Sequence, residues 1–141
     1  MKKIILIAIG GFFGAICRYA IKNLQISGTF PVTTIFINVI GSFILAFVIT
    51  YSVNKKFDAA KLGITTGFCG AFTTFSTLCK ESVLFIQNGN YSDAVTYLLF
   101  MVILGLFAAY CGVTLANLMN YHKNIDTEDL KFTEMTEDDV E

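Results

Sequence analysis

The sequence has very little of what enzymes commonly use for catalysis. Its 141 residues include no tryptophan, one proline and one histidine, His122, which lies beside an acidic tail at the end of the last apolar segment. It contains no Gly-Lys-Ser/Thr loop for a phosphate and no metal-ligand spacing. Lys80 and Glu81 are neighbours in sequence and do not face each other on a helix, so they form no catalytic dyad. We therefore expect a protein that is not an enzyme.

Cysteine usage excludes two further classes of site. The four cysteines stand far apart within apolar segments: Cys17, Cys69, Cys79 and Cys111. Without a CxxC pair or a nearby histidine, neither a zinc site nor a redox motif is indicated, and buried reduced thiols are expected. The start, "MKKIILIAIGGFFGAIC", looks like a signal peptide. Because Arg18 and Tyr19 follow at once and three more long apolar segments come later, we expect a retained membrane span.

Negative charge is scarce in the body of the chain and concentrated at its end. Eight of the eleven Asp and Glu residues fall within residues 126–141, whereas residues 1–122 hold eight Lys and Arg against three acids. The net charge of −1 and the isoelectric point near 5.8 therefore describe the tail. Because residues 122–141 are also poor in apolar side chains, we expect them to form a disordered, solvated tail.

Long apolar segments make up the rest of the chain. Hydrophobic residues account for 55% of the sequence, and the mean hydropathy is +0.65. A helix of about twenty mostly apolar residues crosses a bilayer, and four segments qualify, at residues 4–23, 32–53, 62–86 and 94–121. Short loops rich in Gly, Asn, Asp, Pro and Lys separate them. We expect an all-α membrane protein in which one domain, residues 1–121, contains four transmembrane helices.

Small residues recur at four-residue spacing in three of these segments. They are Gly10 and Gly14, Gly63 and Gly67, and Ala108 with Gly112 and Ala116. This spacing lets helix backbones approach each other closely in lipid. Four short helices enclose little volume, so a pore or substrate path is expected to need a second copy of the chain.

Basic residues indicate how the chain is oriented. With four spans, both termini and the second loop share one side of the membrane. That side carries Lys2, Lys3, Lys55, Lys56, Lys61 and Lys123, whereas the other side has Lys22, with Arg18 and Lys80 close to it. The excess of lysine predicts cytoplasmic termini.

The stretch "GAFTTFS", residues 70–76, places glycines and hydroxyls inside an apolar segment. Gly67 and Gly70 each weaken a helix by about 1 kcal/mol relative to alanine, so we expect the third helix to break here. Non-helical backbone at membrane depth is tolerated only beside protein or a cavity, and its freed carbonyls can bind a small cation. Phe72 and Phe75 share a face if the segment is helical; their ring edges either contact an anion or simply pack.

Two polar side chains inside the apolar segments each allow two interpretations. Arg18 either reaches the membrane interface or attracts anions into a water-filled vestibule. Asn38, in "FINVIGSF", either links two helices or donates a hydrogen bond to a passing anion. These residues point toward a small anion, but composition and spacing do not identify the ion.

Three stretches resemble the signature sequences of the CrcB/Fluc fluoride channels. They are "GGFFGAICRY" (10–19), "TIFINVIGSFILAF" (34–47) and "GFCGAFTTFSTL" (67–78), in the same order and at the right separations. The resemblance implies a prokaryotic plasma-membrane protein that exports fluoride passively. It implies four-helix subunits in an antiparallel, dual-topology dimer, with two pores along the interface and a structural sodium ion at the centre.

The resemblance also implies roles for individual residues. The carbonyls of Gly70 and Thr73 would hold the sodium ion, which explains why the third helix breaks. Phe72, Phe75 and Asn38 would line the fluoride pore, Thr74 and Ser76 would add hydroxyl donors, and Arg18 would lie near the vestibule. The chain departs from the pattern at Gly70-Ala71, where two glycines are common, and the hydroxyls of its fourth span match no assigned pore position: Thr96, Tyr97, Tyr110 and Thr114. A homodimer is favoured over pairing with a paralogue.

Two other functions fit four short helices. A dual-topology multidrug exporter would need a carboxylate in the middle of a span, and Glu81 lies late in the third one. A membrane assembly subunit without transport would use Asn38 and Phe75 only for packing. No feature indicates nucleic-acid binding; lipid and fluoride are the expected partners.

Overall fold

The computed structural model describes residues 1–23, 30–53 and 59–138, and every regular element in these ranges is a helix. The elements are α1 (Lys2–Asn23), α2 (Val32–Tyr51), α3 (Ala59–Leu62), η1 (Gly63–Cys69), α4 (Gly70–Phe72), α5 (Phe75–Gln87) and α6 (Tyr91–Asp138). Four stretches are long and apolar enough to cross a membrane: α1, α2, the run from α3 to α5, and α6 as far as Lys123. The predicted all-α fold with four membrane-spanning helices is confirmed.

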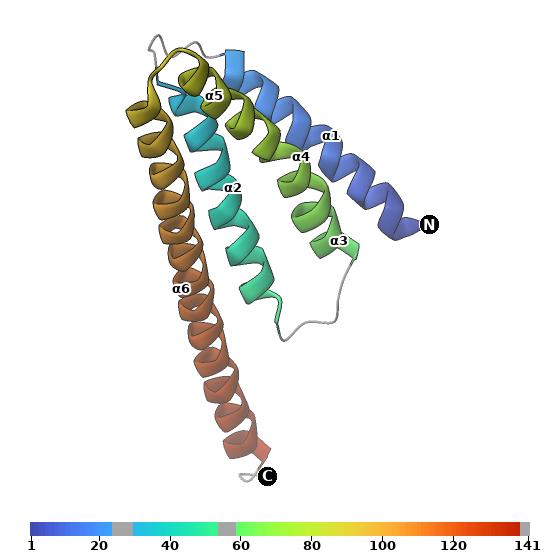
Figure 1. Ribbon diagram of the computed structural model, residues 1–141. Coiled ribbons are helices and arrows are strands. Elements are labelled where there is room, and N and C mark those ends of the chain that lie inside the picture. Colours follow the sequence, from blue (N-terminus) through green and yellow to red (C-terminus); the bar gives the residue numbers. More distant parts are fainter. Residues whose placement is uncertain (24–29, 54–58, 139–141) are drawn as a thin grey trace.

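The third span lies between two neighbours in space. Figure 1 shows α1 along one side of α3 and α4, and α2 along the other side, with α6 beyond α2. Helices α2 and α6 pack closely along much of their length, and α1 packs against η1 and α4. Gly89, with a φ of 77°, provides the turn from α5 into α6, a conformation that glycine adopts without strain. The broken span thereby has protein on both sides over its first half.

Glycine allows the closest approaches between these helices. A Cβ atom added to Gly67 would lie 2.5 Å from the carbonyl oxygen of Ile7 in α1. A Cβ atom added to Gly112 in α6 would lie 2.6 Å from the carbonyl oxygen of Phe43 in α2. In lipid, where burial of apolar surface gives no driving force, such backbone proximity supplies the packing energy. The expectation that the small residues mediate helix contacts is confirmed at these positions.

Replacing Gly112 by alanine is expected to loosen the α2–α6 pair. The added methyl group would meet backbone, which cannot move aside, so we expect a loss of about 1–3 kcal/mol in the free energy of unfolding. Gly105→Ala is the matched control on the same helix, because its nearest atom would be Ser42 Oγ at 3.8 Å. Thermal unfolding in detergent measures both. Equal midpoints for the two variants would contradict the packing described here.

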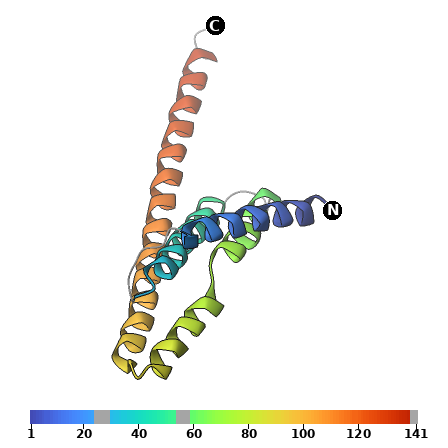
Figure 2. The same ribbon diagram turned by 90° about the horizontal axis from the view of Figure 1, so that it is seen from above.

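Helix α6 does not end where the sequence places the end of the last span. It continues to Asp138 and runs past the other helices in Figure 2. Residues 113–138 contain neither glycine nor proline, so nothing interrupts helical hydrogen bonding once the apolar part has formed. The structure thus corrects the expectation of a disordered tail over residues 122–138. Residues 139–141, and Lys55 and Lys56 of the second loop, lie outside the described residues.

Candidate functional site

The third span is interrupted at two threonines. Helix α4 ends at Phe72, Thr73 (φ −72°, ψ 157°) and Thr74 (φ −147°, ψ 110°) are extended, and α5 begins at Phe75. The expected break within residues 70–76 is confirmed, and it lies at the threonines rather than at the glycine. Gly70 has φ −64° and ψ −33°, the values of a regular helix, whereas the β-branched threonines adopt the extended conformation that suits them. The helix therefore breaks three residues after the glycine.

The side-chain amide of Asn38, on α2, hydrogen-bonds to the backbone at this break. Its Oδ1 accepts the Thr74 backbone N–H at 2.8 Å, and its Nδ2 donates to the Thr74 carbonyl at 3.1 Å. Thr74 is 5% exposed, so both of its backbone groups need partners inside the protein. One side chain thus replaces the two hydrogen bonds that a continuous helix would have supplied. The interpretation of Asn38 as a link between helices is confirmed, and its contact with an anion stays a prediction.

Two backbone carbonyls lose their usual helical partners at the break. In a continuous helix the Gly70 carbonyl would accept the N–H of Thr74, which donates instead to Asn38. The Thr73 carbonyl would accept the N–H of Thr77, which donates instead to Thr74 Oγ1 at 3.2 Å and so caps α5. These are the two carbonyls that the sequence analysis assigns to sodium. Carbonyl oxygens are suitable ligands for a hard cation.

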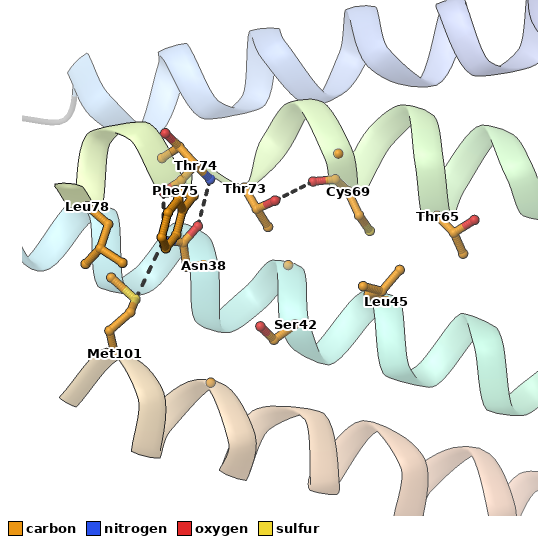
Figure 3. Close-up of a pocket in the computed structure, with 13 residues that line it drawn as sticks. Asn38, Ser42, Leu45, Thr65, Cys69, Thr73, Thr74, Phe75, Leu78 and Met101 are labelled. Carbon is orange, nitrogen blue, oxygen red and sulfur yellow. Dashed lines mark hydrogen bonds between the residues drawn. The ribbon is translucent and has the colours of Figure 1, made fainter. Parts of the chain in front are cut away.

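A pocket of about 360 Å³ lies beside the break, between α2, the third span and α6. Its lining is mixed, with hydroxyl, amide, thioether and apolar groups (Figure 3). The lining residues on α2 are Asn38, Gly41, Ser42 and Leu45; those on the third span are Thr65, Cys69, Gly70, Thr73, Thr74, Phe75 and Leu78; and those on α6 are Met101 and Gly105. No Asp, Glu, Lys or Arg is among them, so the pocket offers neutral donors only.

The two phenylalanines of the "GAFTTFS" stretch lie in different environments. Phe75 lines the pocket and is 76% exposed, whereas Phe72 is 3% exposed and stacks on Phe68 with 5.3 Å between ring centroids. The condition for a shared face, a continuous helix, is not met. Leu78, one turn after Phe75 on α5, lines the pocket with it, and sequence reasoning missed this residue. Its i, i+3 spacing from Phe75 was the available signal.

Two other predicted site residues do not line the pocket. Ser76 is exposed, with its hydroxyl 3.4 Å from Thr74 Oγ1. Arg18 is half-buried on α1, five residues before the helix ends at Asn23, so its side chain lies about 8 Å along the axis from that end. Neither lines the pocket.

The hydroxyls of the fourth span do not line the pocket either. Thr114 donates to the Tyr110 carbonyl at 2.9 Å, and Tyr97 donates to Glu81 Oε2 at 2.7 Å. Helix α6 presents Met101 and Gly105 to the pocket instead. The wall on α6 is therefore without a hydroxyl.

A second polar cluster, around Glu81, was also missed. Glu81 on α5 accepts from Thr34 of α2 at 2.9 Å and from Tyr97 of α6 at 2.7 Å. Thr34 and Tyr97 are both fully buried, and the Tyr97 ring also contacts Phe30 and Phe85 edge-on. The carboxylate thus joins three helices beyond the break. An acid inside an apolar segment was the signal, but sequence alone gives no partner for it.

Removing this carboxylate is expected to destabilise the protein. Glu81→Ala leaves two buried hydroxyls without an acceptor, which costs about 1–3 kcal/mol for each and about 2–6 kcal/mol in total. Tyr97→Phe removes one of the two bonds and is expected to cost about half as much. Thr114→Val is the control, since its hydroxyl bond is local and exposed. In detergent, the thermal midpoint is expected to be highest for Thr114→Val, lower for Tyr97→Phe and lowest for Glu81→Ala. Equal midpoints for Glu81→Ala and Thr114→Val would contradict this prediction.

These features define a class: a four-span helical membrane protein whose third helix is interrupted beside a neutral, polar-lined pocket. The family model for CrcB-like proteins, described as Camphor Resistance (CrcB), matches residues 5–113. The chain belongs to this family.

Curated relatives agree with the family match over most of the chain. A protein of Dehalococcoides mccartyi named fluoride-specific ion channel FluC is 37% identical over 124 residues, which are 84% of this chain and 95% of the relative. Fluoride-specific ion channel FluC 2 of Bacillus cereus is 40% identical over 121 residues, 84% of this chain and 100% of the relative. A FluC protein of Campylobacter jejuni is 40% identical over 117 residues, 79% of this chain and 95% of the relative. The chain is a multi-pass protein of the bacterial cell membrane.

Proposed function

We propose that this protein is a fluoride-specific ion channel that lets fluoride leave the cytoplasm passively. The observation that carries the proposal is the neutral pocket beside the interrupted third span, in a chain of this family. A membrane potential that is negative inside drives an anion outward without further energy. Export of this kind would lower the toxicity of fluoride that enters as neutral HF. It requires no catalytic residue, and we propose no enzymatic activity.

The chemistry of the pocket suits a small, strongly hydrated anion. Conduction requires groups that replace water yet release the ion again. Amide and hydroxyl donors and the positive edge of the Phe75 ring meet this need, whereas a lysine would hold the anion too tightly. Chloride is larger and gains less from such donors. Phe75 and Leu78 would form the apolar side of the path, and Asn38 the polar side.

We propose that two copies assemble head to foot around this pocket. Phe75 is 76% exposed, and a Cβ atom added to Gly70 would meet nothing within 4 Å, so the third span has an open side beside the pocket. A second copy covering this side would enclose a path that one chain leaves open. The resemblance to the fluoride channels favours an antiparallel homodimer, with a paralogous partner as the alternative outcome. Arg18 would face a vestibule at the end of the path.

We further propose that the carbonyls of Gly70 and Thr73 hold a structural sodium ion. The N–H groups that would bind these oxygens in a continuous helix donate to Asn38 and to Thr74 Oγ1 instead, so both oxygens are available to a cation. Two copies would contribute four such oxygens. Replacing sodium by N-methyl-D-glucamine in detergent is expected to weaken dimerisation and lower the thermal midpoint. Potassium chloride at the same ionic strength is the control for a simple salt effect. Indifference to sodium would remove this part of the proposal.

One assay separates the channel from its rivals. Liposomes containing the protein and potassium fluoride receive valinomycin, and an electrode follows external fluoride. Rapid release with chloride retained is expected for the channel. Release only with a proton gradient would favour a multidrug-type exchanger, for which Glu81, partly buried between neutral donors, is the specific observation. No release from a folded dimer would favour an assembly subunit.

A further inference from the structure

Four hydroxyl groups line the pocket, and three of them already donate their protons within the chain. Thr65 donates to the Lys61 carbonyl, Thr73 donates to the Cys69 carbonyl and Thr74 donates to Thr77 Oγ1, each at 2.8 Å. The fourth, Ser42, makes no hydrogen bond with any residue that the structure describes. Ser42 is therefore the hydroxyl donor that is available to a ligand in this pocket.

The position of Ser42 suits a ligand that also meets Asn38. The two residues are four apart on α2, so their Cβ atoms lie about 5–6 Å from each other on the same face. Figure 3 shows Ser42 between α2 and α6, next along the helix from Asn38. On the α6 side stands Gly105, whose absent Cβ would lie 3.8 Å from Ser42 Oγ. Gly105 thus brings no side chain of α6 against the hydroxyl.

The amide of Asn38 has one N–H that is only weakly engaged. Nδ2 donates to the Thr74 carbonyl and also points at Met101 Sδ, 3.6 Å away (Figure 3). A thioether is a weak acceptor, so an anion would replace it readily. The Thr74 bond, by contrast, maintains the break. Asn38 has therefore one N–H for the structure and one for a ligand.

We propose that Ser42 and this second N–H of Asn38 form a two-donor subsite for a desolvated fluoride ion, with Met101 filling the position when the ion is absent. The inference rests on the proposed channel function. It identifies a hydroxyl donor on α2, whereas the α6 residues that line the pocket carry no hydroxyl. Ser42 acts by direct contact with the ion. Because hydrogen bonds to charged groups are stronger than neutral ones, its loss is expected to weaken fluoride binding at least about tenfold.

The test compares Ser42→Ala with a control outside the pocket. Thr114→Val removes a hydroxyl of α6 whose proton is already bound to the Tyr110 carbonyl, and it keeps the shape of the side chain. Initial fluoride efflux from valinomycin-treated liposomes is measured over a range of internal potassium fluoride, which separates the half-saturating concentration from the maximal rate. Elution volume in detergent reports the fold. Ser42→Thr restores a hydroxyl at the tested position.

For Ser42→Ala we expect a half-saturating fluoride concentration at least about tenfold higher, with Thr114→Val within about twofold of wild type and Ser42→Thr largely restored. Unchanged kinetics in Ser42→Ala, or an equal loss in Thr114→Val, would overturn the subsite. If Ser42→Ala does not fold, Ser42→Cys takes its place, since a thiol has similar size but donates poorly. Wild-type protein that releases no fluoride would overturn the proposed function itself, whereas efflux insensitive to Ser42 would overturn the subsite alone.

Discussion

Asn38→Ala is expected to abolish fluoride efflux and to lower the free energy of unfolding by about 2–6 kcal/mol. The variant leaves the N–H and the carbonyl of Thr74 without partners in a position that is 5% exposed, and each such group costs about 1–3 kcal/mol. Efflux fails for two reasons: the break loses its support, and the pocket loses its amide donor. Liposome efflux and thermal unfolding in detergent measure the two effects.

A second asparagine provides the control for this experiment. Asn120 on α6 also donates from Nδ2 to a backbone carbonyl, that of Thr50, at 3.4 Å and away from the pocket. Asn120→Ala is expected to keep efflux within about twofold of wild type and to cost under about 1 kcal/mol. If Asn38→Ala behaved like Asn120→Ala, Asn38 would neither hold the break nor serve the path.

Phe75→Ile is expected to reduce fluoride efflux to about a tenth or less while leaving the fold intact. The isoleucine keeps an apolar surface in the pocket but has no aromatic edge with partial positive charge toward an anion. Because Phe75 is 76% exposed, the single chain loses little packing when the ring is removed. Efflux from liposomes and the elution volume of the assembly are measured together.

An exposed phenylalanine elsewhere tests whether position matters. Phe107 on α6 is 65% exposed and does not line the pocket. Phe107→Ile is expected to conduct like wild type, because its ring lies outside the pocket. Full efflux through Phe75→Ile would show that Phe75 does not line the path. If both variants showed reduced efflux together with loss of the dimer, the two rings would serve assembly instead.

Much of the fold follows from the sequence because hydrocarbon imposes a strict length on a helix. Four apolar segments predicted the four spans within a few residues at most ends, and the glycine spacing marked positions at which helix backbones approach closely. The tail differs because disorder was inferred from its charge and its few apolar side chains, without regard to helix propensity. Glutamate, lysine and methionine are good helix formers, so a chain that is already helical at residue 121 continues to Asp138.

The sequence identified several residues of the site, but it did not predict how they are arranged in space. The unusual stretch at residues 70–76 and Asn38 marked the right region, but residue propensities did not show which residues within the stretch leave the helix. The extended conformation of Thr73 and Thr74 depends on an amide 36 positions away in sequence, and no local propensity contains that information. Ser42 and the contacts of Glu81 were missed for the same reason, since each depends on which helices become neighbours.

The length of α6 has a practical consequence for orientation. Its 48 residues extend about 72 Å at 1.5 Å per residue, whereas the hydrocarbon core is about 30 Å thick. A rod of that length carries its acidic end well clear of the lipid, within reach of an antibody or a protease. An epitope placed at this end would therefore label one membrane surface if all copies insert alike, and both surfaces if the two halves of each assembly point in opposite directions.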